Sequence, residues 1–87
     1  MGDALAPRVL LTIICEASLE QAIVDDLVAL HGRRDANWPH SANIRFEVLC
    51  AEKTALKILD HLQETYYANY GMVTFLSDVL VLRPEKF

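Results

Sequence analysis

The sequence predicts one α+β domain, in which an antiparallel sheet carries two helices on one of its faces. Residues 9–15 and 72–82 hold apolar side chains at odd and even positions alike, so both faces of these strands require burial. Only two segments show the apolar spacing of a helix long enough to cover a sheet. Right-handed crossovers place both helices on the same face. The other face then requires another protein surface, and the sequence predicts an oligomer.

The first half of the chain predicts a strand over residues 8–15 and a helix that begins at Ser18. Ser18 and Gln21 have the spacing of a capping box, and Gly32 follows the helix at a position that tolerates a left-handed turn. The inward-facing residues share helical spacing: Leu19, Ala22, Ile23, Leu27 and Leu30. Acidic residues between them, Asp26 included, are expected to face water.

The second half predicts two strands, a helix and a strand. Residues 33–43 have weak strand propensity and predict a short, irregular edge strand. Residues 44–50 alternate as a strand, residues 52–69 form the second helix, and Pro84 ends the last strand. The order βαββαβ is that of a ferredoxin-like domain, and it uses the whole chain, residues 1–87.

Composition excludes several classes of protein. The chain has 87 residues, 53% of them apolar, and a net charge of -4. The acidic balance argues against a nucleic-acid partner, and no apolar stretch approaches the roughly 20 residues of a membrane span. Two cysteines are too few for a disulfide framework, and the N-terminus lacks a signal-peptide pattern. We therefore expect a cytoplasmic protein.

The end of the chain carries a resemblance. Residues 70–87, YGMVTFLSDVLVLRPEKF, together with Arg45-Phe46-Glu47-Val48-Leu49-Cys50, resemble the PII-like superfamily, in particular a small nitrogen-regulatory branch that is related to CutA-type trimers. The resemblance implies a non-enzymatic signalling protein, a homotrimer that binds a small ligand or a metal ion between its subunits. It also implies a transporter as candidate partner, such as one for heavy-metal efflux.

Two departures from PII proteins affect the ligand. Asn69-Tyr70-Gly71-Met72 passes directly from helix to strand, so the glycine-rich, lysine-containing phosphate loop is absent. This absence argues against adenine nucleotide binding of the PII type and leaves the cofactor open. Only about a dozen residues separate Gly32 from Ile44, too few for a long effector-docking loop as well as an edge strand.

Candidate ligand-binding residues follow from the resemblance, since basic residues just past the last strand meet phosphates in PII relatives. Arg83 and Lys86 take those positions here, and Tyr70 and Arg45 are further candidates for a cleft between subunits.

Candidate metal ligands are Cys15, Cys50 and His40. The two cysteines each end a strand that precedes a helix, and those strands are interpreted as parallel neighbours in the centre of the sheet. The thiols would then lie at the same end, roughly 5–7 Å apart. Burial as two small apolar side chains is the alternative. His61 is expected on the solvated side of the second helix.

No catalytic constellation is evident, so the leading hypothesis is a non-enzymatic regulator. Two alternatives remain open. The first is a copper- or zinc-binding tolerance protein that uses the cysteines and histidines. The second is a small dimeric α/β-barrel enzyme, whose dimer would also bury the second face of the sheet.

Overall fold

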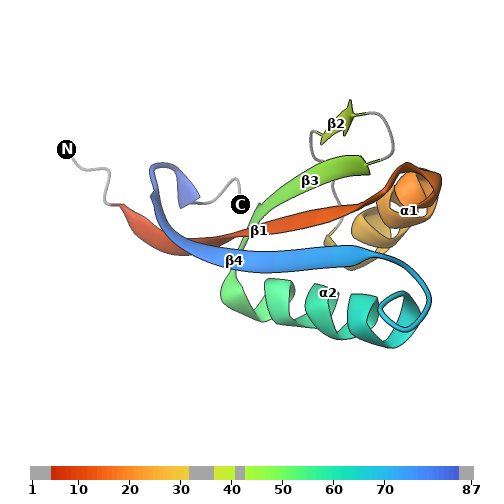
Figure 1. Ribbon diagram of the computed structural model, residues 1–87. Coiled ribbons are helices and arrows are strands. Elements are labelled where there is room, and N and C mark those ends of the chain that lie inside the picture. Colours follow the sequence, from red (N-terminus) through yellow and green to blue (C-terminus); the bar gives the residue numbers. More distant parts are fainter. Residues whose placement is uncertain (1–4, 32–36, 41–42, 85–87) are drawn as a thin grey trace.

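The computed structural model confirms the predicted order of elements (Figure 1). It describes residues 5–31, 37–40 and 43–84, with the backbone alone for residues 37–40. The elements are β1 (Ala6–Glu16), the 3-10 turn η1 (Ala17–Leu19), α1 (Glu20–His31), β2 (Asn37–His40), β3 (Asn43–Cys50), α2 (Glu52–Thr65) and β4 (Met72–Val81).

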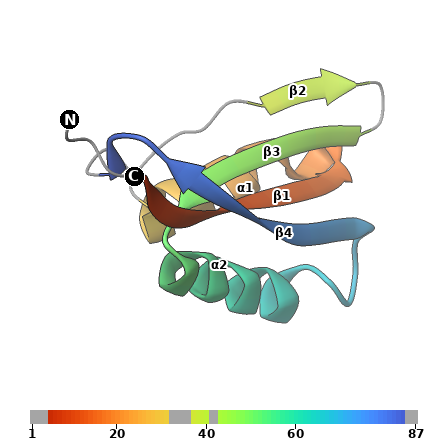
Figure 2. The ribbon, with the colours of Figure 1, turned by 90° about the vertical axis from the view of Figure 1, so that its left-hand side faces the viewer.

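The four strands form one antiparallel sheet in the order β2-β3-β1-β4. Figure 2 shows α1 and α2 together on one side of it, as the right-handed crossovers predict. The segment with weak strand propensity contains the edge strand β2, and only two residues separate β2 from β3. The fold is therefore the ferredoxin-like α+β fold that the sequence predicts.

The ends of the helices differ from the prediction. Ser18 does not cap α1, because it lies within η1 and its hydroxyl donates to Glu16 Oε1 at 2.9 Å. Gln21 instead donates from Nε2 to Asp25 Oδ1 at 2.9 Å. The second helix ends at Thr65 rather than Asn69. The capping box is therefore wrong, since the chain enters the helix through a tighter turn.

The core lies between the sheet and the helices. From Val9 to Cys15 in β1 and from Ile44 to Cys50 in β3, every second residue points to the helices and is at most 5% exposed. They meet the apolar stripes of both helices, and Phe46 is the largest fully buried side chain. The core residues of these strands and helices are Val9, Leu11, Ile13, Cys15, Leu19, Ile23, Leu27, Ile44, Phe46, Val48, Cys50, Ala55, Ile58 and Leu62.

On the opposite face of the sheet, here called the open face, lies none of the helices that the structure describes. Its apolar side chains include Val73, which is 57% exposed, and Phe75, which is 44% exposed. Thr12 is buried between its register partners Phe75 and Glu47. The strand register assigns these residues to the open face: Leu10, Thr12, Ile14, Arg45, Glu47, Leu49, Val73, Phe75, Ser77 and Val79.

Candidate functional site

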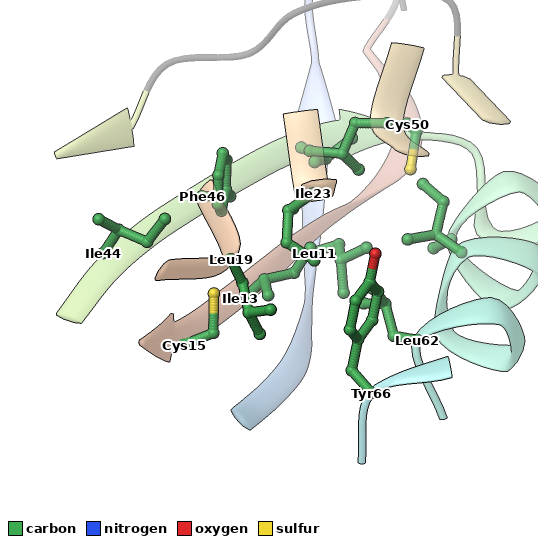
Figure 3. Close-up of a cluster of buried hydrophobic side chains, with 14 of the residues drawn as sticks. Leu11, Ile13, Cys15, Leu19, Ile23, Ile44, Phe46, Cys50, Leu62 and Tyr66 are labelled. Atoms are coloured by element: carbon green, nitrogen blue, oxygen red, sulfur yellow. The ribbon is translucent and has the colours of Figure 1, made fainter. Parts of the chain in front are cut away.

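The two cysteines do not meet, so the predicted pair of metal-ligating thiols is wrong. β1 and β3 are antiparallel, and Cys15 pairs with Ile44 whereas Cys50 pairs with Val9. Six residues of strand, or about 20 Å, therefore separate the thiols along the sheet. Figure 3 shows Cys15 and Cys50 at opposite ends of the core. Strand direction causes the difference: in this order of elements β3 returns after β2 and runs against β1.

Each cysteine is a buried apolar side chain of the core. Both are 1% exposed, and burial together with the charge of Glu16 raises the pKa of Cys15 from 9.0 to about 11. A thiol with a raised pKa is a poor nucleophile and a poor metal ligand near neutral pH. His40, the third predicted ligand, lies in β2, where the description extends only to the backbone. Among the described residues, no three metal-ligating side chains gather.

The predicted ligand-binding residues lie at two ends of the molecule. Arg45 pairs in register with Ile14, near the end of β1. Tyr70 precedes β4, which begins at the same end of the sheet, and its side chain is 42% exposed. Arg83 follows β4 at the opposite end, about 30 Å away along ten residues of strand. Within one chain, Arg83 therefore lies far from Tyr70 and Arg45. Lys86 lies outside the described residues.

Arg45 is on the open face and forms an ion pair there. Its Nη2 lies 3.2 Å from Glu47 Oε2, and both side chains are partly exposed. Such an exposed pair contributes less than about 1 kcal/mol to stability. It leaves a positive and a negative charge beside the apolar side chains of the open face.

Arg83 has an unusual backbone conformation. Its φ is 66°, the left-handed region, and it is the one non-glycine residue of the described chain with a positive φ. This conformation costs an ordinary L-residue about 1–2 kcal/mol. Its side chain is exposed. A strained, exposed arginine two residues beyond the end of a strand is a candidate binding residue.

A cluster that the sequence did not predict joins the two helices. The Tyr66 hydroxyl donates to Asp26 Oδ2 at 2.5 Å, and His61 Nε2 lies 3.1 Å from the same oxygen. The contact of His61 with Asp26 lacks hydrogen-bond geometry. Asp26 and His61 are partly buried, in contrast to the solvated positions that helical spacing predicts. The sequence pointed to this cluster only through Tyr66, because the hydroxyl of a buried tyrosine requires a hydrogen-bond partner.

This cluster also organises the turn before β4. The Tyr66 carbonyl accepts hydrogen bonds from the amides of Asn69 and Tyr70, each at 3.0 Å. The rings of Tyr66 and Tyr70 meet edge to face with centroids 6.1 Å apart. Burial is the main cause of a raised pKa for Tyr66, and the hydrogen bond to Asp26 is the second cause. Its hydroxyl therefore keeps its proton and remains a donor. The turn at the place of the glycine-rich loop of PII proteins is thus held by backbone hydrogen bonds to the Tyr66 carbonyl and by the contact of the Tyr66 and Tyr70 rings.

An open hollow of about 270 Å³ lies at the other end of the sheet, beside the start of α2. None of the predicted site residues lines it. Its lining residues are Pro7, Arg8, Val9, Glu52 and Asp78.

Comparison with known proteins identifies the family. The profile of the family described as nitrogen regulatory protein P-II matches residues 29–86, about two thirds of the chain. The chain therefore belongs to the P-II family. No curated protein matches its sequence.

Solved structures of PII-like proteins share the whole fold. A PII-like signalling protein of Thermus thermophilus is similar with a TM-score of 0.87 and 31% identity, over 95% of this chain and 97% of its own. CPII of Thiomonas intermedia, a nitrogen regulatory PII-like protein bound to ADP, AMP and bicarbonate, has a TM-score of 0.84 and 22% identity. That match covers 97% of this chain and 100% of CPII.

No described helix is long and apolar enough to cross a membrane.

The raised pKa of Cys15 predicts a loss of stability at alkaline pH. The unfolded thiol releases its proton near pH 9 and the folded thiol near pH 11, so the folded state binds more protons in between. The free energy of unfolding should therefore fall as pH rises from 9 to about 11. Urea unfolding at several pH values measures this slope. Cys15→Ala should show a shallower slope, and an unchanged slope would contradict the assignment.

The contact between Tyr66 and Asp26 predicts a loss of stability when the Tyr66 hydroxyl is removed. Tyr66→Phe keeps the ring but deletes the donor to Asp26, so we expect it to lower the free energy of unfolding by about 1–2 kcal/mol. Tyr67→Phe is the matched control, because Tyr67 is 41% exposed and its hydroxyl shares an exposed hydrogen bond with Thr74 Oγ1 at 2.6 Å. Urea unfolding compares the two, and equal losses would show that the Asp26 contact contributes nothing specific.

Proposed function

We propose that this protein is a non-enzymatic, cytoplasmic PII-like regulator that acts as a homotrimer and binds a small anionic ligand between subunits. Membership of the P-II family supports the class. The observation that carries the proposal is the open face, which presents Val73 and Phe75 to water in the single chain. Exposed apolar side chains on a sheet face are typical of a subunit interface.

The separation of the candidate residues supports a site between subunits. Within one chain Arg83 lies at the opposite end of β4 from Tyr70 and Arg45. A neighbouring subunit can bring its own Arg83 to the end that holds Tyr70 and Arg45. Lys86 follows in the same terminal segment and would add a second positive charge.

The chemistry of these residues favours an anion. Arginine presents planar donors that match phosphate and carboxylate groups, and the ring of Tyr70 offers an exposed apolar surface. Since the backbone loop that cradles phosphates in PII proteins is absent, side-chain cations would supply the phosphate contacts. The similar CPII, solved with ADP, AMP and bicarbonate, suggests ADP and bicarbonate as the first probes.

The regulated partner follows from family resemblance alone and is proposed to be a transporter, such as one for heavy-metal efflux. A docking mode that needs a long loop between β2 and β3 does not suit two intervening residues. The metal-tolerance alternative is disfavoured, since the thiols of Cys15 and Cys50 lie far apart in the core.

A charge placed on the open face should dissociate the trimer. We expect native mass spectrometry to show a trimer for the natural sequence and a monomer for Phe75→Glu, because burying an unpaired carboxylate in an apolar interface costs several kcal/mol. Leu56→Glu is the matched control, since Leu56 is 48% exposed on α2, on the other side of the sheet. A monomer of the natural sequence would refute the proposed assembly, and a dimer would revive the enzyme alternative.

Removing the charge of Arg83 should weaken anion binding. Isothermal titration with ADP, and separately with bicarbonate, is expected to show binding that Arg83→Gln weakens about tenfold or more. Lys57→Gln, which removes an exposed charge from α2, should bind as the natural sequence does. Equal affinity of Arg83→Gln and the natural sequence would remove Arg83 from the site.

A further inference from the structure

The turn that carries Arg83 is held against its local preference. Arg83 has a φ of 66°, which the β-carbon of an L-residue disfavours. The following residue, Pro84, further restricts Arg83 toward extended conformations. Proline also lacks an N–H group, so it offers no donor of its own to close the turn. The conformation must therefore be fixed by contacts from elsewhere in the fold.

Arg8 provides such a contact. Its Nη2 donates to the Pro84 carbonyl at 3.1 Å, and its Nη1 donates to the Pro7 carbonyl at 2.8 Å. One planar guanidinium thus joins the start of β1 to the chain beyond β4, 76 residues later. The two strands are hydrogen-bonded at this end, where Arg8 pairs in register with Val79.

The direction of the returning chain agrees with this contact. Figure 1 shows residues 82–84, beyond β4, turning back toward the sheet on the side away from the helices. Arg8 lies on that same side by its register. Val81, the last residue of β4, is buried and Pro84 is half-buried, so the turn is packed at both ends while Arg83 between them is exposed.

We propose that Arg8 is a positioning residue of the anion site: its two hydrogen bonds to the Pro7 and Pro84 carbonyls hold Arg83 in the left-handed conformation and so direct the Arg83 side chain toward the ligand. This inference rests on the proposed function, in which Arg83 binds the anion. In this proposal Arg8 donates to two backbone carbonyls of its own chain, and Arg83 is the residue that contacts the ligand. Binding therefore depends on Arg8 through Arg83.

A double-mutant cycle tests this coupling. ADP affinity is measured by isothermal titration for the natural sequence, Arg8→Gln, Arg83→Gln and the double variant. We expect Arg8→Gln to weaken ADP binding about tenfold, and the double variant to bind no more weakly than Arg83→Gln alone. Arg8→Lys should resemble Arg8→Gln, because an ammonium group lacks the planar fork that reaches two carbonyls. Lys57→Gln again controls for the loss of one positive charge.

A second measurement reads the turn without ligand. The Cα and Cβ chemical shifts of Arg83 report its backbone conformation, and ¹⁵N relaxation reports its order. Both should change in Arg8→Gln and stay unchanged in Lys57→Gln. Arg83→Gly, which adopts a left-handed backbone without strain, should unfold at no lower urea concentration than the natural sequence.

Each contrary outcome has a distinct meaning. If Arg83→Gln weakens ADP binding and Arg8→Gln does not, the positioning role fails and the proposed function stands. If the two losses multiply in the double variant, Arg8 contacts the ligand directly and is not a positioning residue. If the natural sequence binds neither ADP nor bicarbonate, the anion site and its positioning residue are both overturned. Unchanged Arg83 shifts in Arg8→Gln would also overturn the role of Arg8.

Discussion

The two-layer arrangement of the molecule, with helices on one face of the sheet, determines which side chains are buried and which are exposed. Two helices cover one face of a four-stranded sheet, and β1 and β3 send every second side chain into that layer. The strands alternate, so their remaining side chains must point the other way. On the open face β4 adds Val73 and Phe75, at positions where a water-exposed sheet would carry polar residues. The described residues form no further helix that could cover this face, which supports the proposed association of subunits.

Polar contacts between distant segments then fix the parts that the core leaves exposed. At one end of the sheet, Asp26 and Tyr66 join α1 to α2 and steady the turn before β4. At the other end, Arg8 joins the start of β1 to the carbonyl of Pro84. Both contacts link an early element to a late one, and both hold a turn rather than a regular element. These two contacts fix the conformation of the turns without a glycine-rich loop or a long insertion.

Membership of the P-II family gives this arrangement a functional context. Residues 29–86 match the family, and the similar solved structures cover nearly the whole chain. The chain keeps the sheet and both helices but has two residues between β2 and β3 and no glycine-rich turn before β4. A ligand site built from Arg83, Tyr70 and Arg45 would therefore rely on side chains from two subunits. In the proposed site, the Arg8 contact with the Pro84 carbonyl would position Arg83.

The sequence by itself determined the class of fold, because apolar periodicity and chain order are local properties that leave few topologies. It also predicted the uncovered sheet face and the P-II family. It misplaced Cys15 and Cys50, because their separation depends on the direction of β3 relative to β1. Only the tertiary structure paired Asp26 with Tyr66, and Arg8 with Pro84, across 40 and 76 residues. Such contacts have no local pattern, since they depend on where folding brings two distant segments together.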